Sequence, residues 1–313
     1  MIFTLTLNPA LDRYLYTGKL IADDTVRIDK IKDYPAGKGV DVSRVINELG
    51  GHSVAIAFLG GRIGDEIEEM LNDEGVVYAS VRIEGETRMN ILIESDGGQY
   101  RLSLPGPDLS EREIDKLHKT IDILLREGDT LLMCGSVPGG VGKDIYRVLC
   151  ERMTGRKIKV YIDSDKEPLA EGVKASPTGI KPNTHELDRL LGRESGGDYE
   201  KALREVSERY SIPEVLLTMG KEGAMAMIEG RIYRVEVPAV PVKSAVGAGD
   251  SFLGAYCMYR EMGGTVETAL KMAGAASVAT VMTPGTELCR REDVVKIMEK
   301  VKVNKKAQVR DWR

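Results

Sequence analysis

A glycine-rich turn that runs directly into a helical pattern is the strongest chemical signal in this sequence. It reads Val246-Gly247-Ala248-Gly249-Asp250. Small residues let the backbone N–H groups of a first helical turn approach an anion, and the helix dipole favours negative charge there. Asp250 would then serve as a general base that takes a proton from an attacking hydroxyl while the turn holds a transferring phosphoryl group. Alternatively, Asp250 is only a favoured residue at a helix N-terminus, and spacing alone does not decide.

Three further clusters suit ligand binding, and each also has an ordinary structural interpretation. Gly37-Lys38-Gly39 precedes a helical pattern and fits either a phosphate at Lys38 or a flexible turn. Asp12 follows the first predicted strand, where ligands of parallel sheets gather, or it caps a turn. Asn183 and Glu186 stand three residues apart, which suits a hydrated Mg²⁺ or a helix capping box.

Other catalytic patterns are absent from the sequence. The spacing of a Walker loop is missing, and Gly60-Gly61-Arg62-Ile63-Gly64 lacks the full dinucleotide fingerprint, so we expect a structural turn there. The four cysteines form no CxxC pair and are expected to be buried thiols in a reducing compartment. None of the three histidines has the spacing of a metal ligand.

Composition narrows the function classes further. The 313 residues are 42% hydrophobic and 30% charged, as in a globular protein that buries a core. A net charge of −5 with scattered charges argues against nucleic-acid binding. The N-terminus has no signal-peptide pattern, and the longest uncharged apolar stretch, Met272 to Thr283, is too short to span a bilayer. We therefore expect a cytoplasmic protein without a membrane partner.

Apolar runs and amphipathic stretches alternate along most of the chain. Apolar runs, with or without period-two alternation, predict strands at 2–7, 55–59, 130–134, 157–162 and 215–218. Helical spacing predicts helices that include 42–49, 110–125 and 144–153, the second opened by a capping-box pattern at Ser110 and Glu113. This alternation implies a mainly parallel sheet covered by helices.

Two regions break this rhythm. Residues of about 12–34 and 82–104 carry strand-like segments with no helix between them, which predicts a small antiparallel sheet that acts as a lid. The last thirteen residues, 301–313, hold five basic residues and one acid, and we expect a solvated tail.

Taken in order, these stretches resemble the ribokinase-like sugar kinases of the phosphofructokinase B subfamily. The resemblance covers nearly the whole chain. Its motifs are Thr6 to Asp12, Gly37-Lys38-Gly39, Glu86-Thr87-Arg88, Pro105-Gly106-Pro107, Cys134 to Pro138, Lys181-Pro182-Asn183 with Glu186, Thr218 to Gly223 and Val246 to Asp250. It implies a ribokinase-like, Rossmann-type three-layer α/β sandwich with a small β-sheet lid, in a single domain over 1–313. It also favours catalysis over capping for Asp250.

The resemblance implies an ATP-dependent kinase that converts a ketohexose phosphate to a 1,6-bisphosphate and forms a homodimer through its lid. Asp250 would be the base, and Gly247, Ala248 and Gly249 would form the anion hole. The implied sugar-phosphate ligands are Asp12, Gly37, Lys38, Arg88 and Ser136, with Arg27 and Asp41 beside them. Asn183 and Glu186 would act on Mg²⁺-linked phosphates, and Lys181, Thr218, Gly220 and Gly223 would contact ATP. Ser244, Val246, Thr283 and Gly285 would hold a monovalent cation, K⁺.

The sequence departs from the subfamily at two places. Asp41 stands where the subfamily usually has Asn. This extra carboxylate can still accept sugar hydroxyls, but it works against a nearby phosphate unless Lys38 neutralises it. Ser244-Ala245 replaces the Asp-Thr often found before the glycine turn. Fructose 1-phosphate, fructose 6-phosphate and tagatose 6-phosphate stay open as substrates. A free-sugar or nucleoside kinase, a non-catalytic sugar-phosphate regulator and a nicotinamide-dependent dehydrogenase are the rival interpretations.

Overall fold

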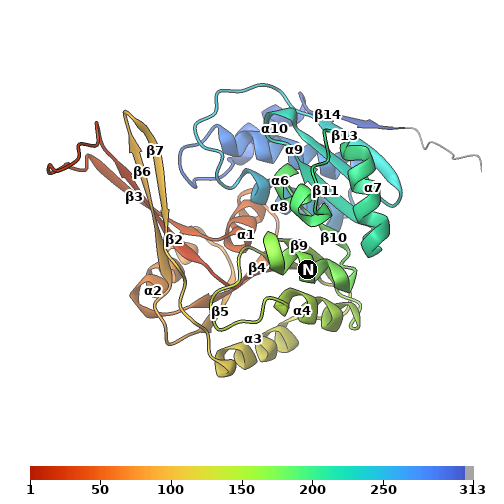
Figure 1. Ribbon diagram of the computed structural model, residues 1–313, viewed down its shortest axis with the longest axis horizontal. Coiled ribbons are helices and arrows are strands. Elements are labelled where there is room, and N and C mark those ends of the chain that lie inside the picture. The colour runs from red at the N-terminus through yellow and green to blue at the C-terminus, as the bar shows by residue number, and fades with distance from the viewer. Residues whose placement is uncertain (307–313) are drawn as a thin grey trace, which may run out of the picture.

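A ten-stranded sheet forms the centre of the molecule in the computed structural model, which describes residues 1–306 (Figure 1). In spatial order its strands are β14 (Lys302–Lys305), β13 (Arg231–Glu236), β12 (Ala224–Ile228), β11 (Glu214–Thr218), β10 (Gly179–Ile180), β9 (Lys159–Asp163), β8 (Thr130–Cys134), β1 (Ile2–Thr6), β4 (Ser53–Leu59) and β5 (Tyr78–Arg82). The strands from β5 to β11 run parallel, as expected. The first strand of the chain, β1, therefore lies between β4 and β8.

The other end of this sheet is antiparallel, which the alternation pattern did not predict. β12 pairs with β11 and β13, and β14 pairs with β13. The expected solvated tail is therefore wrong for Lys302–Lys305, where backbone pairing with residues 233–236 adds an edge strand to the sheet. Lysines are common on edge strands because they discourage further pairing. The rest of the expected tail, 307–313, lies outside the described residues.

Helices cover both faces of the large sheet. One face carries α3 (Glu111–Leu124), α4 (Ile145–Thr154), α5 (Lys166–Gly172), α6 (Thr184–Leu191) and α7 (Tyr199–Tyr210). The other carries α1 (Lys38–Glu48), α2 (Gly61–Asp73), α8 (Ala248–Glu261), α9 (Val266–Val281) and α10 (Arg291–Met298). Short 3₁₀ turns, η1 (Val173–Ala175) and η2 (Gly220–Glu222), follow α5 and β11. The result is the three-layer sandwich that the sequence predicts.

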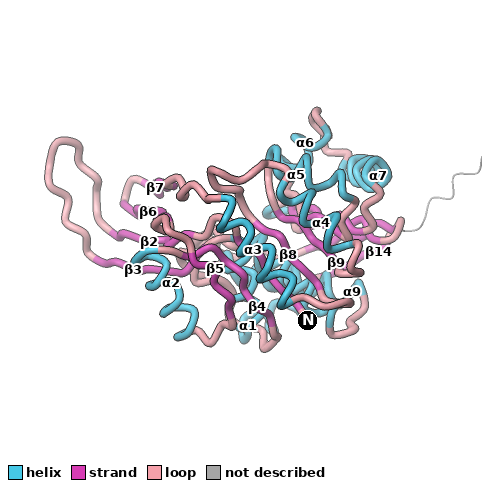
Figure 2. Tube along the Cα trace, turned by 90° about the horizontal axis from the view of Figure 1, so that it is seen from below, coloured by secondary structure: helices cyan, strands magenta, loops and turns pink. Residues whose placement is uncertain are grey.

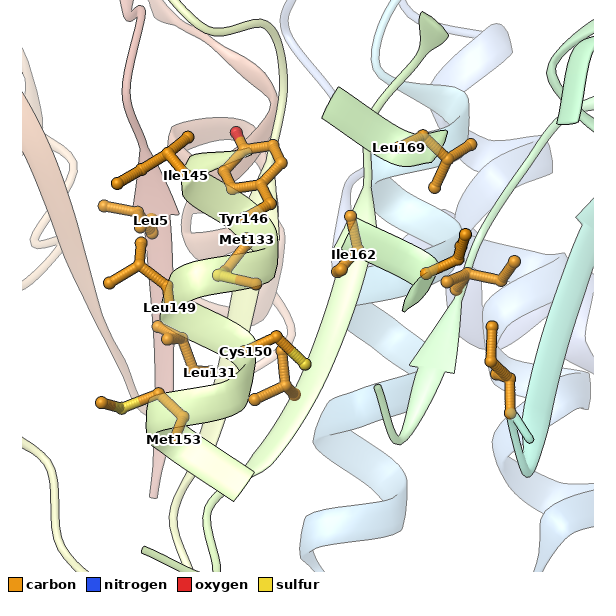
Figure 3. Close-up of a cluster of buried hydrophobic side chains, with 14 of the residues drawn as sticks. Leu5, Leu131, Met133, Ile145, Tyr146, Leu149, Cys150, Met153, Ile162 and Leu169 are labelled. Carbon is orange, nitrogen blue, oxygen red and sulfur yellow. The ribbon is translucent and has the colours of Figure 1, made fainter. Parts of the chain in front are cut away.

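The packing of α4 illustrates how alternation builds this core. Its buried face packs over the side chains that β1, β8 and β9 direct to the same side of the sheet, among them Leu131, Met133 and Ile162 (Figure 3). Leu149 and Met153 are fully buried on that helix. Truncating a buried leucine of this kind to alanine costs about 2–5 kcal/mol of stability. The capping box expected at Ser110 and Glu113 is likewise present at the start of α3.

A second, four-stranded sheet projects from the main body, with strand order β3-β2-β6-β7 (Figures 1 and 2). Its strands are β2 (Ala10–Tyr16), β3 (Lys30–Ala36), β6 (Arg88–Ser95) and β7 (Gly98–Ser103). The two outer pairs are antiparallel, but β2 and β6 pair in parallel, so the expectation of an antiparallel sheet is wrong for its central pair. β2 follows β1 after a short turn, so the small sheet begins at the carboxyl edge of the large one. The first residues of β2 and β6 therefore lie closest to that edge.

Within residues 1–306, none of the helices combines the length and apolar character needed to cross a bilayer. Most of the apolar stretch 272–283 belongs to α9, whose side chains are largely buried against α8 and α10. All four cysteines are buried and free, as expected.

Candidate active site

The glycine turn before α8 adopts a conformation that requires glycine. Gly247 is left-handed, with φ of 76°, and a Cβ atom there would collide with the side chain of Leu288. A Cβ atom on Gly249 would stand 3.0 Å from Nζ of Lys181. The turn thus brings the N-terminus of α8, including the backbone N–H groups of Ala248 and Gly249, up to a lysine side chain. This is a favourable arrangement for an anion.

Asp250 lies in the first turn of α8 and is only 8% exposed. Burial raises the pKa of its carboxyl to about 7, and the neighbouring charge of Asp163 acts in the same direction. The charges of Lys38 and Lys181 oppose this shift. A carboxyl that titrates near neutral pH suits a general base, because a substantial fraction is ionised and it is basic enough to hold the proton it accepts.

Two lysines converge on one buried carboxylate beside Asp250. Nζ of Lys38 donates to Oδ1 of Asp163 over 2.7 Å, and Nζ of Lys181 lies 3.0 Å from Oδ2 of Asp163. Burial alone would raise the pKa of Asp163, but the two lysines hold it below its ordinary value. Each ammonium group keeps hydrogens that Asp163 does not use, so this corner of the site can still donate hydrogen bonds to an anionic ligand.

Sequence reasoning missed Asp163. The apolar run predicts a strand that ends at Ile162, whereas the strand continues to Asp163 at the carboxyl edge of the sheet. An acidic residue that directly follows a buried parallel strand was the available signal.

The Asn183 and Glu186 side chains form the capping box that was one of their two interpretations. Oδ1 of Asn183 accepts from the Glu186 amide over 2.9 Å, and Oε2 of Glu186 accepts from the Asn183 amide over 2.8 Å. The other carboxylate oxygen of Glu186 lies 3.8 Å from Nζ of Lys38. One oxygen of Glu186 therefore faces the same corner as the two lysines. The capping box does not use this oxygen.

The segment after β11 lies next to this capping box. Thr218 forms an isolated bridge with Asn183, and its amide donates to the carbonyl of Pro182 over 3.1 Å. Gly220 opens the turn η2, and no atom stands within 4 Å of a Cβ built on it. Gly223 ends the turn at φ of 82°, where a Cβ atom would collide with the carbonyl oxygen of Val235. The backbone at Gly220 is thus open to a ligand, while Gly223 is required by packing.

Asp12 lies on β2 and belongs to a second part of the site. Its carboxylate accepts from Nδ2 of Asn90 over 2.8 Å and from the Thr286 hydroxyl over 3.0 Å. Burial raises the pKa of Asp12 above its ordinary value, although these hydrogen bonds and the charge of Arg88 act against the rise. Asn90 and Thr286 were not predicted, because neither belongs to a motif and tertiary packing alone brings them to Asp12.

Asp41 is buried on α1, and the expectation that Lys38 neutralises it is wrong. Lys38 is committed to Asp163, and the cation that faces Asp41 is Arg44, whose Nη1 lies 3.4 Å from Oδ1 of Asp41. Lys38 sits three residues earlier, at the first residue of α1. Its side chain is therefore engaged on the Asp250 side of the site.

Arg88 stands at the start of β6, where the small sheet meets the main body. Its Nη2 donates to the carbonyl of Asn8 over 3.1 Å, and its Nη1 donates to that of Leu104 over 3.3 Å. The side-chain Nδ2 of Asn8 in turn donates to the Ser136 hydroxyl over 3.1 Å. Carbonyl acceptors carry no net charge, so Arg88 keeps a full positive charge for an anionic ligand.

Gly37 lies against Pro9, at the start of α1. Its φ is 122°, and a Cβ atom there would stand 2.8 Å from Cγ2 of Thr6 and 3.1 Å from Cα of Pro9. Glycine is needed for this close approach, which brings α1 against the end of β1.

Arg27 lies far from Arg88 in a single copy of the chain. It is exposed, and its carbonyl accepts from Thr17 at the far end of β2. Arg88 instead pairs with Ala10 at the near end of that strand. Six residues of extended chain separate the two ends, about 20 Å. The expectation that Arg27 assists Arg88 is therefore wrong for a single copy of the chain.

The residues expected to hold a monovalent cation lie on two neighbouring loops behind the glycine turn. The amide of Ser244 donates to the carbonyl of Val281 over 3.4 Å, which joins the loop before α8 to the end of α9. The hydroxyl of Ser244 accepts from the amide of Val246 over 3.2 Å. Thr283 donates to the carbonyl of Leu288, and Gly285 is left-handed with φ of 62°. These two loops thus bring several oxygen atoms together. The hydroxyls of Ser244 and Thr283 keep lone pairs for a cation.

Comparison with known proteins agrees with this geometry. The family model described as pfkB family carbohydrate kinase matches residues 6–293. The chain is 32% identical to a 1-phosphofructokinase of Borreliella burgdorferi over 97% of this chain and 98% of that one. It is 32% identical to the ATP-dependent 6-phosphofructokinase isozyme 2 of Escherichia coli over 95% and 97%. A crystal structure of phosphofructokinase-2 from Escherichia coli with substrates and products superposes with a TM-score of 0.91, at 31% identity over 96% and 98%. The chain therefore belongs to the pfkB family of carbohydrate kinases.

Proposed function

We propose that this protein transfers the γ-phosphoryl group of ATP to a hydroxyl of a ketohexose phosphate, which yields a 1,6-bisphosphate. One observation carries the proposal: the buried Asp250, with its pKa near 7, lies in the same helical turn as the backbone N–H groups of Ala248 and Gly249. A base and an anion cradle within one turn are what phosphoryl transfer to an alcohol requires. The names of the relatives support the substrate class.

In this mechanism one end of the site carries the base and binds the nucleotide, and the other end binds the sugar phosphate. Asp250 accepts the proton of the attacking sugar hydroxyl, and the turn N–H groups stabilise charge on the transferring phosphoryl group. Lys38 and Lys181, held in place by Asp163, balance the negative charge of the nucleotide phosphates. The open backbone at Gly220 and the adjoining Thr218 contribute to the nucleotide side.

The polar groups present also fit two cations. Glu186 has one carboxylate oxygen that capping does not use, which suits a Mg²⁺ held through water. Such an ion supplies charge neutralisation at the nucleotide phosphates. The oxygens of the loops at Ser244, Val246, Thr283 and Gly285 suit K⁺, whose charge would strengthen the anion cradle of the glycine turn.

At the other end, the sugar phosphate binds between the small sheet and α1. Asp12 accepts hydrogen bonds from sugar hydroxyls, as a carboxylate can accept two at once. Arg88 pairs with the phosphate already on the substrate, and Ser136 and Gly37 complete the walls. The small sheet acts as a lid because it supplies Asp12, Asn90 and Arg88 to this pocket.

The lid also offers a surface for a second copy of the chain. Ile31, Leu15, Ile93 and Tyr100 form one row across its four strands and so share a face. Ile31 is 57% and Tyr100 46% exposed, which is unusual for such side chains unless a partner covers them. A homodimer through this face is expected to fall apart in Ile31→Asp, as measured by sedimentation, while a wild type that sediments as a monomer would contradict it.

An ADP-release assay over five acceptors tests the function. Fructose 6-phosphate, fructose 1-phosphate and tagatose 6-phosphate are the expected substrates, with at least one turned over far faster than the others. Free fructose and a nucleoside are the controls without a phosphate. Preference for either control would replace the proposal with a kinase for uncharged acceptors, and ADP release with none of the five would overturn it.

A further inference from the structure

The side chain of Asp41 is buried without a strong partner. It is 4% exposed, and within residues 1–306 its single side-chain hydrogen bond is the 3.4 Å contact with Nη1 of Arg44. That distance is at the outer limit for an N–H donor. A buried carboxylate normally takes two or three close donors, so Asp41 lacks what an ionised group needs.

Arg44 cannot make up this deficit because its donors are committed elsewhere. Its Nε and Nη2 donate to Glu74 over 2.6 and 2.7 Å, so one carboxylate already balances its charge. Its Nη1 donates to the carbonyls of Thr286 and Pro35 over 3.0 and 3.1 Å. The two hydrogens on Nη1 thus have two acceptors that lie closer than Asp41. The hydrogen bond from Arg44 to Asp41 is therefore weak.

The other charged groups around Asp41 are acids or already paired cations. Asp12 on β2 and Asp250 on α8 both act on it with negative charge. Lys38 is bound by Asp163, and Arg88 by two carbonyls on the lid side. Burial, together with the charges of Asp250 and Asp12, raises the pKa of Asp41 well above its ordinary value, against the lowering effect of Arg44.

We propose that Asp41 meets the sugar phosphate as a neutral carboxylic acid and donates its proton in a hydrogen bond to a substrate oxygen. The inference rests on the proposed function and concerns the same site. The proton stays on Asp41 throughout, because Asp250 is the base that accepts the proton of the attacking hydroxyl. Asp12, which has two donors of its own, is the matching acceptor.

This assignment removes the conflict between Asp41 and a phosphorylated substrate. A neutral acid adds no negative charge to a pocket that already holds Asp12 and Asp250. It also gives the pocket one donor and one acceptor, so a substrate oxygen beside Asp41 must accept a hydrogen bond. A substrate oxygen without a hydrogen, such as a carbonyl or ring oxygen, satisfies that requirement.

The test compares the pH dependence of kcat/KM for the sugar phosphate in the wild type and in Asp41→Asn. An amide cannot lose a proton in this range, but it keeps an N–H donor. The wild type is expected to lose activity on an alkaline limb, about tenfold per pH unit, that is missing in Asp41→Asn. Asp122→Asn, on the exposed face of α3, is the matched control and should keep the wild-type limb. Identical limbs in the wild type and Asp41→Asn would overturn the inference.

A second measurement does not depend on turnover. In infrared spectra at neutral pH, the carbonyl band of a protonated carboxyl is expected in the wild type and should be reduced by one group in Asp41→Asn. An unchanged band would mean that Asp41 is ionised, and the inference would fail even with full activity. If instead the wild type phosphorylates none of the sugar phosphates, the proposed function fails while the infrared result still stands.

Discussion

Lys38 donates to the buried carboxylate of Asp163 over 2.7 Å and so joins the first residue of α1 to the last residue of β9. Asp163→Asn is expected to destabilise the protein by about 3–5 kcal/mol, because it leaves two lysines without their buried partner. Urea unfolding measures this loss. Asp165→Asn, two residues on and paired with Arg189 at the surface, is the control and should cost less than about 1 kcal/mol. Equal losses in the two variants would mean that Asp163 does not hold the lysines.

Asp163 also sets the pH range of Asp250. The base must be ionised to accept a proton, so kcat/KM for the wild type should rise with pH up to about 7, below the alkaline limb expected from Asp41. Asp163→Asn removes a negative neighbour and frees two positive ones, which lowers the pKa of Asp250. The acidic limb of kcat/KM should therefore move to lower pH in this variant. A limb that stays in place would show that another group controls it.

Asp250→Asn is expected to lower kcat by about 10²–10⁴-fold, the usual contribution of a general base. Nucleotide binding, measured by calorimetry, should persist because the turn N–H groups and both lysines remain. Asp188→Asn on α6 is a suitable control, since its side chain accepts from the backbone amide of Ser195, away from the glycine turn. Near-normal turnover of Asp250→Asn would contradict its role as base.

Arg88→Ala is expected to raise KM for the sugar phosphate far more than KM for ATP. Its guanidinium lies on the lid side and donates to two neutral carbonyls, whereas the lysines proposed to meet the nucleotide, Lys38 and Lys181, lie beside Asp163. Steady-state kinetics with each substrate varied in turn provide the measurement. Arg101→Ala on β7, whose guanidinium donates to the side chain of Gln99, is the control. Equal increases in both KM values would rule out a specific role at the sugar phosphate.

Alanine substitutions at Gly223 and Gly230 distinguish the cost of a steric clash from the cost of backbone strain. Both have positive φ, 82° and 80°, but only Gly223 faces a neighbour that a Cβ atom would strike, the carbonyl oxygen of Val235. Gly230→Ala should cost about 1–2 kcal/mol from the left-handed backbone alone. Gly223→Ala should cost distinctly more in urea unfolding. Equal costs would mean that the β12–β13 hairpin moves aside freely.

Local patterns predicted much of the fold. Strands β1, β4, β8 and β11 follow from their apolar runs, and the capping residues of α3 follow from the spacing of Ser110 and Glu113. The edge strand β14 was missed because its lysines resemble a solvated tail, and only pairing with β13 orders it.

The candidate site divides in the same way. The glycine turn and Asp250 were recognisable because their chemistry lies within one short segment. Asp12 and Asp41 were recognisable as positions, but their partners Thr286 and Arg44 were not, since these contacts depend on how separate elements pack. The charge balance at Asp41 was wrong for that reason: the nearest lysine in sequence, Lys38, turns toward Asp163 instead.

The central place of β1 also constrains how the protein forms during synthesis. β1 leaves the ribosome before both of its neighbours, and one of them, β8, ends at Cys134. At about 5–20 residues per second, β8 follows β1 after roughly 6–26 s. Until then β1 has at most β4 beside it, so the nascent chain exposes the future centre of its sheet. Chaperone binding to ribosome-bound chains should accordingly decline once β8 has emerged.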